Sequence, residues 1–172
     1  MPTGDGPSRD RPEMPDGYGV PDTTDGLLEW SAVEERLVAS PQYWMATTRR
    51  DGRPHVVPRW GVWVDGRFWY DGAPTTVHAR NIARSGACTL HLEDGWQAVI
   101  VEGTSQPADP PGVELGARLA AGFATKYATR GYEPGPDSWE GPSAGGLVVF
   151  RPTKAVAWFD FPNDVTRFRF TP

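Results

Sequence analysis

The sequence has a single cysteine, Cys88, so no disulfide can form within the chain. It also lacks any apolar run near the roughly 20 residues that a membrane-spanning helix needs. Basic residues are in the minority, with 17 Lys and Arg against 22 Asp and Glu, which argues against a general nucleic-acid binder. The N-terminus shows no basic stretch followed by an apolar one, the pattern of a secretory signal. We therefore expect a cytoplasmic protein.

The motifs of several enzyme classes are missing as well. Cys88 and the three histidines, His55, His78 and His91, show no metal-ligand spacing, so we expect no metal site. No Gly-rich fingerprint leads from a strand into a helix, and no serine lies in a nucleophile-elbow pattern. Aromatic residues are abundant instead, with eight Trp, seven Phe and five Tyr. Composition leaves open whether they form a core or line a pocket or an interface.

The first 26 residues differ in composition from the rest of the chain. They are rich in proline and glycine and contain few apolar side chains. Such a segment buries too little surface to offset the entropy of ordering it. We interpret residues 1–26 as a flexible N-terminal arm, with an arm that drapes over a partner subunit as the alternative. Residues 27–172 then form a single domain, because no repeat or second linker divides them.

The apolar period predicts many short strands with a few helices between them. A capping-box pattern at Ser31–Glu34 predicts a helix over 32–39. Two Asp-Gly turns join the first three strands into a meander, and Pro58 marks a strand edge or a bulge. Strands are expected over 43–48, 54–64, 68–70, 87–93, 97–104, 147–151, 154–159 and 166–170, and further helices over 77–85 and about 109–127. This order predicts a fold that is mainly β with α additions, a barrel or a sandwich.

The start of the helix over 77–85 is the most informative segment for chemistry. A helix N-terminus presents free N–H groups and a partial positive charge, which suits a phosphate group. Two hydroxyl residues, Thr75 and Thr76, precede it, and Thr76 is a plausible N-cap. Further donors follow within the helix: His78, Arg80, Asn81 and Arg84. The alternative is an ordinary capped surface helix with solvated arginines.

Several stretches resemble a known family in their order and spacing. They are Tyr43–Thr48, Asp51–Pro58, Trp60–Trp63 and Ala79–Ile82. Together they resemble the pyridoxamine 5′-phosphate oxidase-like superfamily, whose members are split β-barrels that bind FMN or coenzyme F-420. The likeness is greater to the actinobacterial flavin/deazaflavin oxidoreductases of the B type, and it covers about residues 31–104. The resemblance implies an FMN-binding split β-barrel that works as a homodimer.

The resemblance also implies which residues bind the cofactor. In the family, the second strand lies along the flavin ring, which assigns His55, Val56, Val57, Pro58 and Trp60. The loop and helix after the third strand hold the phosphate, which assigns Thr75, Thr76, His78, Arg80 and Asn81. Many relatives have a lysine where His78 stands, and a neutral imidazole holds a phosphate less firmly. The second subunit completes the site in the family, with Trp96, Gln97 and Trp158 as candidates here.

The implied function is an oxidoreductase that transfers a hydride between coenzyme F-420 or FMN and a small organic acceptor. Arg59 and His55 are candidates for polarising that acceptor. A true pyridoxamine phosphate oxidase has a substrate-binding arginine and histidine near its C-terminus. This C-terminus has Arg167 and Arg169, but no histidine follows His91, so vitamin B6 oxidation is not expected. A non-catalytic flavin- or haem-binding module, or a dimeric barrel without a cofactor, is the alternative.

Overall fold

The computed structural model describes residues 6–140 and 146–171. The strands are β1 Ser8–Asp10, β2 Tyr43–Thr48, β3 Pro54–Arg59, β4 Val62–Val64, β5 Arg67–Asp71, β6 Ala87–His91, β7 Val99–Pro107, β8 Leu147–Ala157 and β9 Thr166–Arg169. The helices are α1 Trp30–Ala39, α2 Val77–Arg84 and α3 Gly112–Tyr127, with short 3-10 turns at Asp16–Tyr18 and Ala128–Arg130. The prediction of a mainly β fold with α additions is confirmed.

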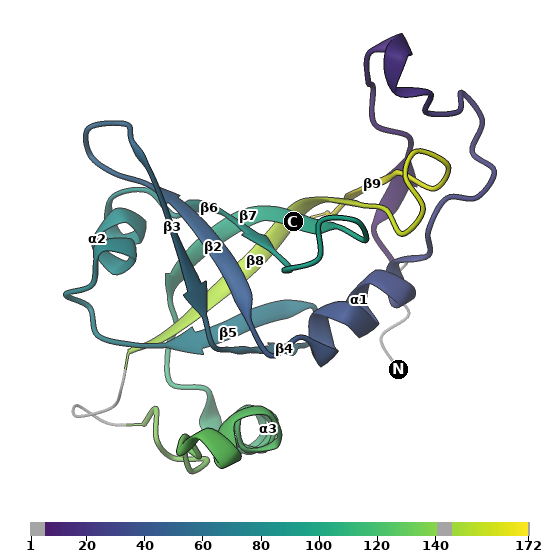
Figure 1. Cartoon of the computed structure of the whole chain (residues 1–172). Coiled ribbons are helices and arrows are strands. Elements are labelled where there is room, and N and C mark those ends of the chain that lie inside the picture. Colours follow the sequence, from purple (N-terminus) through teal and green to yellow (C-terminus); the bar gives the residue numbers. More distant parts are fainter. Residues whose placement is uncertain (1–5, 141–145, 172) are drawn as a thin grey trace.

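All strands belong to one antiparallel sheet that curls into a partly open barrel (Figure 1). Its order is β1-β9-β8-β7-β6-β2-β3, and the β4–β5 hairpin joins it through β8. Strand β8 has two partners on the same side, since residues 147–150 pair with β5 and residues 154–157 pair with β9. The sheet therefore divides along β8, which produces the split barrel.

The stretch predicted as one long strand, residues 54–64, is two strands in the structure. Strand β3 pairs with β2, whereas β4 pairs with β5, so the predicted three-strand meander is wrong. The break falls at Gly61, where a Cβ atom would lie 2.3 Å from the ring of Phe68. The hydroxyl of Tyr127 accepts the N–H of Gly61 at 2.9 Å, so α3 holds the backbone at this point. Both Asp-Gly turns between these strands do form, with positive φ at Gly52, Asp65 and Gly66. The third Asp-Gly turn that the sequence predicts, at residues 94 and 95, has no positive φ.

Two further boundaries differ from the prediction. The expected strands 147–151 and 154–159 are the single strand β8, because a register shift opposite Gly103 accommodates Pro152. Helix α1 begins at Trp30, so Ser31 lies inside it and does not cap it. Glu34, the other residue of the predicted capping box, accepts the indole N–H of Trp63 at 2.9 Å.

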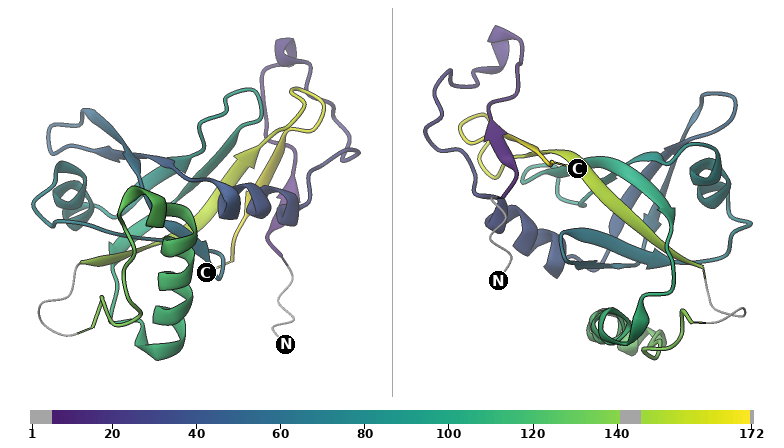
Figure 2. Two further views of the ribbon diagram at one scale, coloured as in Figure 1. Left: turned by 60° about the horizontal axis from the view of Figure 1, so that its bottom comes forward. Right: turned by 180° about the vertical axis from the view of Figure 1, so that it is seen from behind.

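The segment interpreted as a flexible arm contributes a strand to the sheet (Figure 2). Strand β1 pairs with β9, and the carboxylate of Asp10 accepts hydrogen bonds from Arg167 and Arg169, each at 2.7 Å. Arg11 donates to the carbonyl of Val165 at 2.9 Å. The prediction of flexibility is therefore wrong for residues 8–11. Backbone pairing and ion pairs hold this segment against β9. The amino-acid composition could not predict these contacts, because it shows only that the segment has few apolar residues.

The aromatic residues supply much of the core. Seven of them are almost fully buried: Tyr43, Tyr70, Tyr127, Phe68, Phe123, Phe150 and Phe168. One cluster fills the barrel, and a second lies between β4, β5, β8 and α3. Other aromatic side chains lie at the surface, with Trp96 89% exposed. None of the helices within residues 6–140 and 146–171 has the length and apolar character needed to cross a bilayer.

Candidate functional site

Strand β3 lies at the edge of the sheet, as Pro58 predicts. It pairs only with β2, and its side chains alternate between two environments. His55, Val57 and Arg59 are half-buried, whereas Val56 and Pro58 are exposed. Helix α2 lies beside the β2–β3 hairpin (Figure 1). Among the five residues that the resemblance assigns to the flavin ring, the four in β3 therefore have side chains on opposite faces of the strand.

Helix α2 begins where the sequence predicts. Thr76 is its N-cap, with an extended backbone and a hydroxyl 3.4 Å from the amide nitrogen of Ala79, from which it accepts. The first turn of a helix leaves N–H groups without an acceptor inside the helix and carries a partial positive charge. Thr75 is exposed just before this turn. The predicted capped helix start is thus formed, and its binding of an anion stays a prediction.

A short chain of polar contacts fixes α2 against the hairpin. The amide of Asn81 donates to Oγ1 of Thr47 at 3.0 Å, and this oxygen lies 3.5 Å from Nδ1 of His55. Asn81 and Thr47 are both buried. The side chain of Asn81, assigned to the phosphate by resemblance, is therefore engaged in positioning the helix. Thr47 was not recognised from the sequence, where it is one hydroxyl residue of a strand.

The basic side chains of Arg59 and His55, from β3, lie close to the imidazole of His78 at the start of α2. Burial, followed by the nearby charges of Arg59 and His55, lowers the pKa of His78 to about 4, so its imidazole is neutral at pH 7. Burial also lowers the pKa of Arg59. The Nη2 group of Arg59 donates to the carbonyl of Asp71, and its buried Nε has no partner among residues 6–140 and 146–171. We call Arg59, His55, His78 and the first turn of α2 the cationic cradle.

The carboxylate of Asp71 is already engaged elsewhere. It accepts the indole N–H of Trp139 at 3.0 Å and the hydroxyl of Tyr132. A hollow of about 310 Å³ opens between these groups, lined by Pro58, Arg59, Trp60, Asp71 and Tyr132. The ring of Trp60 stacks on Tyr127 at 4.8 Å and forms one wall. The hollow is lined by the Arg59 guanidinium and the Asp71 carboxylate together. The fit of these residues to the phosphate of a flavin or deazaflavin therefore rests on the Arg59 side chain alone.

A second hollow, of about 550 Å³, lies on the outer side of the same helix start. Arginines of the β2–β3 turn line it together with Arg80, whose guanidinium donates to the carbonyl of Thr75 at 2.6 Å. These turn residues are Arg49, Arg50 and Arg53. They were missed because they are distant from α2 in the sequence. Their signal is a run of three arginines around an Asp-Gly turn.

The residues predicted to complete the site from a second subunit lie elsewhere. Trp96, Gln97 and Trp158 line an aromatic hollow of about 590 Å³ together with Tyr18 and Phe161. Most of these residues belong to the β6–β7 and β8–β9 connections, which lie at the opposite end of the sheet from α2 (Figure 1). Within one chain, therefore, these residues do not meet the cationic cradle. Residues 6–140 and 146–171 contain no group of three or more His, Cys, Asp or Glu side chains placed to share a metal ion.

Comparison with known proteins identifies the family. The profile of the family described as pyridoxamine 5′-phosphate oxidase matches residues 30–158. The chain belongs to this family. The resemblance drawn from the sequence is thereby confirmed, and with it the split-barrel fold. No curated protein matches the chain.

Solved structures of the same fold differ in what their names describe. An F420 reductase is 22% identical, with a TM-score of 0.51 over 70% of this chain and 94% of its own. A heme binding protein from Mycobacterium smegmatis is 17% identical, with a TM-score of 0.60 over 83% of this chain and 59% of its own. The heme storage protein HutZ from Vibrio cholerae is 15% identical, with a TM-score of 0.53 over 71% of this chain and 88% of its own. These similarities establish the fold alone.

Proposed function

We propose that the protein is an oxidoreductase that transfers a hydride between a bound flavin or deazaflavin, FMN or coenzyme F-420, and a small organic acceptor. The observation that carries the proposal is the cationic cradle, in which the buried Nε of Arg59 has no partner among the described residues. Membership of the pyridoxamine 5′-phosphate oxidase family and the F420 reductase of the same fold support it.

In this proposal the cofactor supplies the hydride chemistry and the chain supplies position and charge. Arg59 and the first turn of α2 hold the phosphate, since a guanidinium and free N–H groups both donate to anionic oxygens. Arg80 adds a positive charge on the outer side of the turn. His55 is then the better candidate for polarising the acceptor, because Arg59 is occupied. Trp60, stacked on Tyr127, shields one side of the hollow from water.

We further propose a homodimer in which the aromatic hollow of one chain completes the cradle of the other. The exposure of Trp96, at 89%, and of Val56, at 49%, supports an interface at these surfaces. Mixing two variants tests it. Chains with Arg59→Met and chains with Trp96→Ala should each lose cofactor binding alone. A two-fold dimer formed from an equal mixture regains roughly a quarter of intact sites. No recovery would mean that each site belongs to one chain.

The decisive experiment is a paired titration of the purified protein with FMN and with coenzyme F-420. We expect at least one to bind, and Arg80→Ala to weaken that binding by about tenfold, because a charge-assisted contact is lost. Arg67→Ala is the matched control, since Arg67 is an exposed arginine at the far end of β5. Failure of both ligands to bind contradicts the proposal.

A non-catalytic haem-binding module is the second candidate. It rests on the heme binding protein and the heme storage protein among the structures with this fold. A Soret band after addition of haem, with no binding of either flavin-type cofactor, would favour it over the oxidoreductase.

A further inference from the structure

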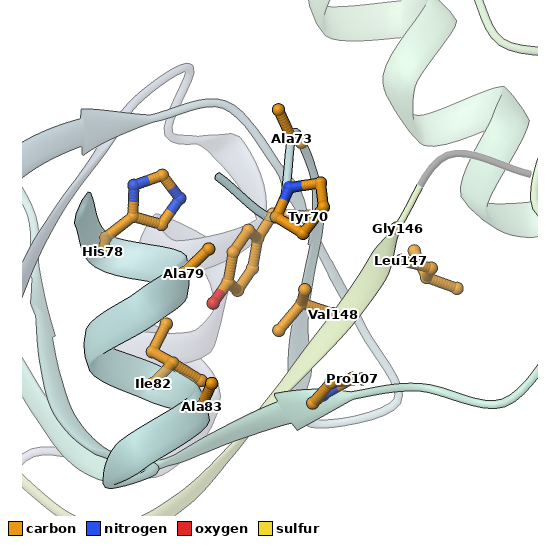
Figure 3. Close-up of a pocket in the computed structure, with 12 residues that line it drawn as sticks. Tyr70, Ala73, His78, Ala79, Ile82, Ala83, Pro107, Gly146, Leu147 and Val148 are labelled. Carbon is orange, nitrogen blue, oxygen red and sulfur yellow. The ribbon is translucent and has the colours of Figure 1, made fainter. Parts of the chain in front are cut away.

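The aromatic hollow is separate from the cationic cradle. Its lining comes from the N-terminal segment before α1 and from the β6–β7 and β8–β9 connections, and it shares no residue with the cradle. The apolar cavity beside α2 differs in this respect, because His78 and Ala79 at the start of that helix line it (Figure 3). The aromatic hollow is therefore the place for a ligand of a different kind.

Exposed aromatic side chains gather at this hollow. Within residues 6–140 and 146–171, three aromatic side chains are exposed, and all three line it: Tyr18 at 56%, Trp96 at 89% and Phe161 at 40%. Single exposed apolar residues are ordinary on a protein surface, whereas exposed apolar groups that gather in one place mark a binding surface. The hollow thus has the character of a site and not of a packing defect.

The rings are arranged so that their faces remain available. Phe161 meets Trp158 at a centroid distance of 5.6 Å and an angle of 66°, and it meets Tyr18 at 6.4 Å and 84°. These are edge-to-face contacts, so Tyr18 and Trp158 each keep at least one face that Phe161 does not cover. The face of an aromatic ring carries negative partial charge and attracts cations. The guanidinium of Arg36 already lies 3.8 Å from the ring centroid of Phe159, which also lines the hollow.

The charge of the lining has the sign that a cation requires. Asp160 is the one charged side chain among the described residues that line the hollow. It is exposed, its Oδ2 accepts the amide of Asn163 at 2.9 Å, and it belongs to none of the ion pairs within residues 6–140 and 146–171. The carboxylate of Asp164 accepts the backbone N–H groups of Phe159 and Asp160, each at 2.9 Å, which holds this loop in place. The lining therefore favours a cation over an anion.

We propose that the aromatic hollow binds an organic ammonium ion, a quaternary or alkylated amine, between the ring faces and the carboxylate of Asp160. Alkyl groups give such a cation an apolar surface that suits aromatic walls. A volume of about 590 Å³ lies within the range of small-molecule sites, so the ammonium can carry a further organic group. Binding requires no cofactor. Only the ligand's role rests on the proposed function: in the proposed homodimer the hollow faces the partner's cofactor, and the ammonium compound would be the acceptor.

Choline and 3,3-dimethylbutan-1-ol test the need for charge, because the two molecules have the same shape and only choline is charged. The assay is an NMR titration of the full chain, without flavin or deazaflavin. Choline should bind about tenfold more tightly than the alcohol, since ring faces and a carboxylate both stabilise the cation. The indole N–H signals of Trp96 and Trp158 should shift, and that of Trp139, beside Asp71, should not. Equal affinities, or no choline binding, would overturn the proposal.

Two variants separate the contributions to binding. Asp160→Asn removes the charge but keeps an oxygen for Asn163, so it should weaken choline binding by about threefold and leave binding of the alcohol unchanged. Trp96→Leu removes one exposed ring but keeps an apolar side chain, and it should weaken choline binding by about two- to fivefold.

Asp109→Asn is the matched control, because Asp109 is an exposed carboxylate beyond the other end of β7. It should bind choline as the wild type does. Wild-type affinity for choline in folded Asp160→Asn and Trp96→Leu proteins would show that the cation binds elsewhere, and the proposal would be wrong. The result is independent of the titration with FMN and coenzyme F-420, which tests the oxidoreductase and not this site.

Discussion

Replacement of Arg59 with methionine separates the effect of this buried charge on the stability of the fold from its effect on cofactor binding. In the protein alone, the change removes a hydrogen bond to the carbonyl of Asp71 and the contact with the ring of Tyr70. It also removes a charge whose burial is unfavourable, as its lowered pKa indicates. These effects oppose one another, so we expect the free energy of unfolding to change by no more than about 1 kcal/mol.

Binding should respond far more strongly than stability. A hydrogen bond to a charged group contributes about 1.5–3 kcal/mol, so loss of the guanidinium should weaken cofactor binding by about 10- to 150-fold. The pKa of His78 should rise at the same time, because the Arg59 charge helps to depress it. Isothermal titration gives the affinity, and NMR titration of the His78 ring gives the pKa.

The matched control is Arg67→Met, which removes an exposed arginine at the opposite end of β5 and should leave all three quantities unchanged. A folded Arg59→Met protein that binds the cofactor with wild-type affinity would refute the assignment of the cradle. So would a large loss of stability with no loss of affinity, because Arg59 would then be structural.

Three further predictions concern pH. Since the pKa of His78 falls from 6.5 to about 4 on folding, stability should decrease as pH drops through that window, and His78→Gln should flatten the profile in urea unfolding. Burial lowers the pKa of Lys126 from 10.5 to about 8, so stability should rise between pH 8 and 10.5, a rise that Lys126→Met should abolish. The hydrogen bond from Arg167 lowers the pKa of Asp10 from 3.8 to about 2, so this contribution should be lost as pH falls through that range. Asp10→Asn should accelerate amide hydrogen exchange in β1.

Local signals predicted the parts of the fold that depend on neighbouring residues. The strand Tyr43–Thr48 has the predicted bounds, and Thr76 caps α2 as its hydroxyl indicates. The Asp-Gly turns form because Gly, and less often Asp, adopts a positive φ at low cost. Each of these features is decided within a few residues along the chain.

The remaining features depend on contacts between distant segments. The break at Gly61 is enforced by Phe68 and Tyr127, and Arg59 meets Asp71 only because β3 and β5 end at the same place. Neither contact leaves a periodic signal in the sequence. The two-residue period did predict the alternation of side chains along β3. It did not predict which face meets a ligand, because an edge strand alternates its side chains whatever its ligand is.

The C-terminal arginines bear on the expectation that this chain does not oxidise vitamin B6. Pyridoxamine phosphate oxidation was not expected because no histidine accompanies Arg167 and Arg169. In the structure both guanidinium groups donate to the carboxylate of Asp10 and so hold β1 against β9. A group that is already paired with a carboxylate offers little to a substrate phosphate, because that pair must first be broken. Two buried Arg donors have no partner among the described residues, Nε of Arg59 and Nη1 of Arg151. Of these two side chains, only Arg59 lines the hollow with Trp60 and Tyr132, where we propose that an anionic ligand binds.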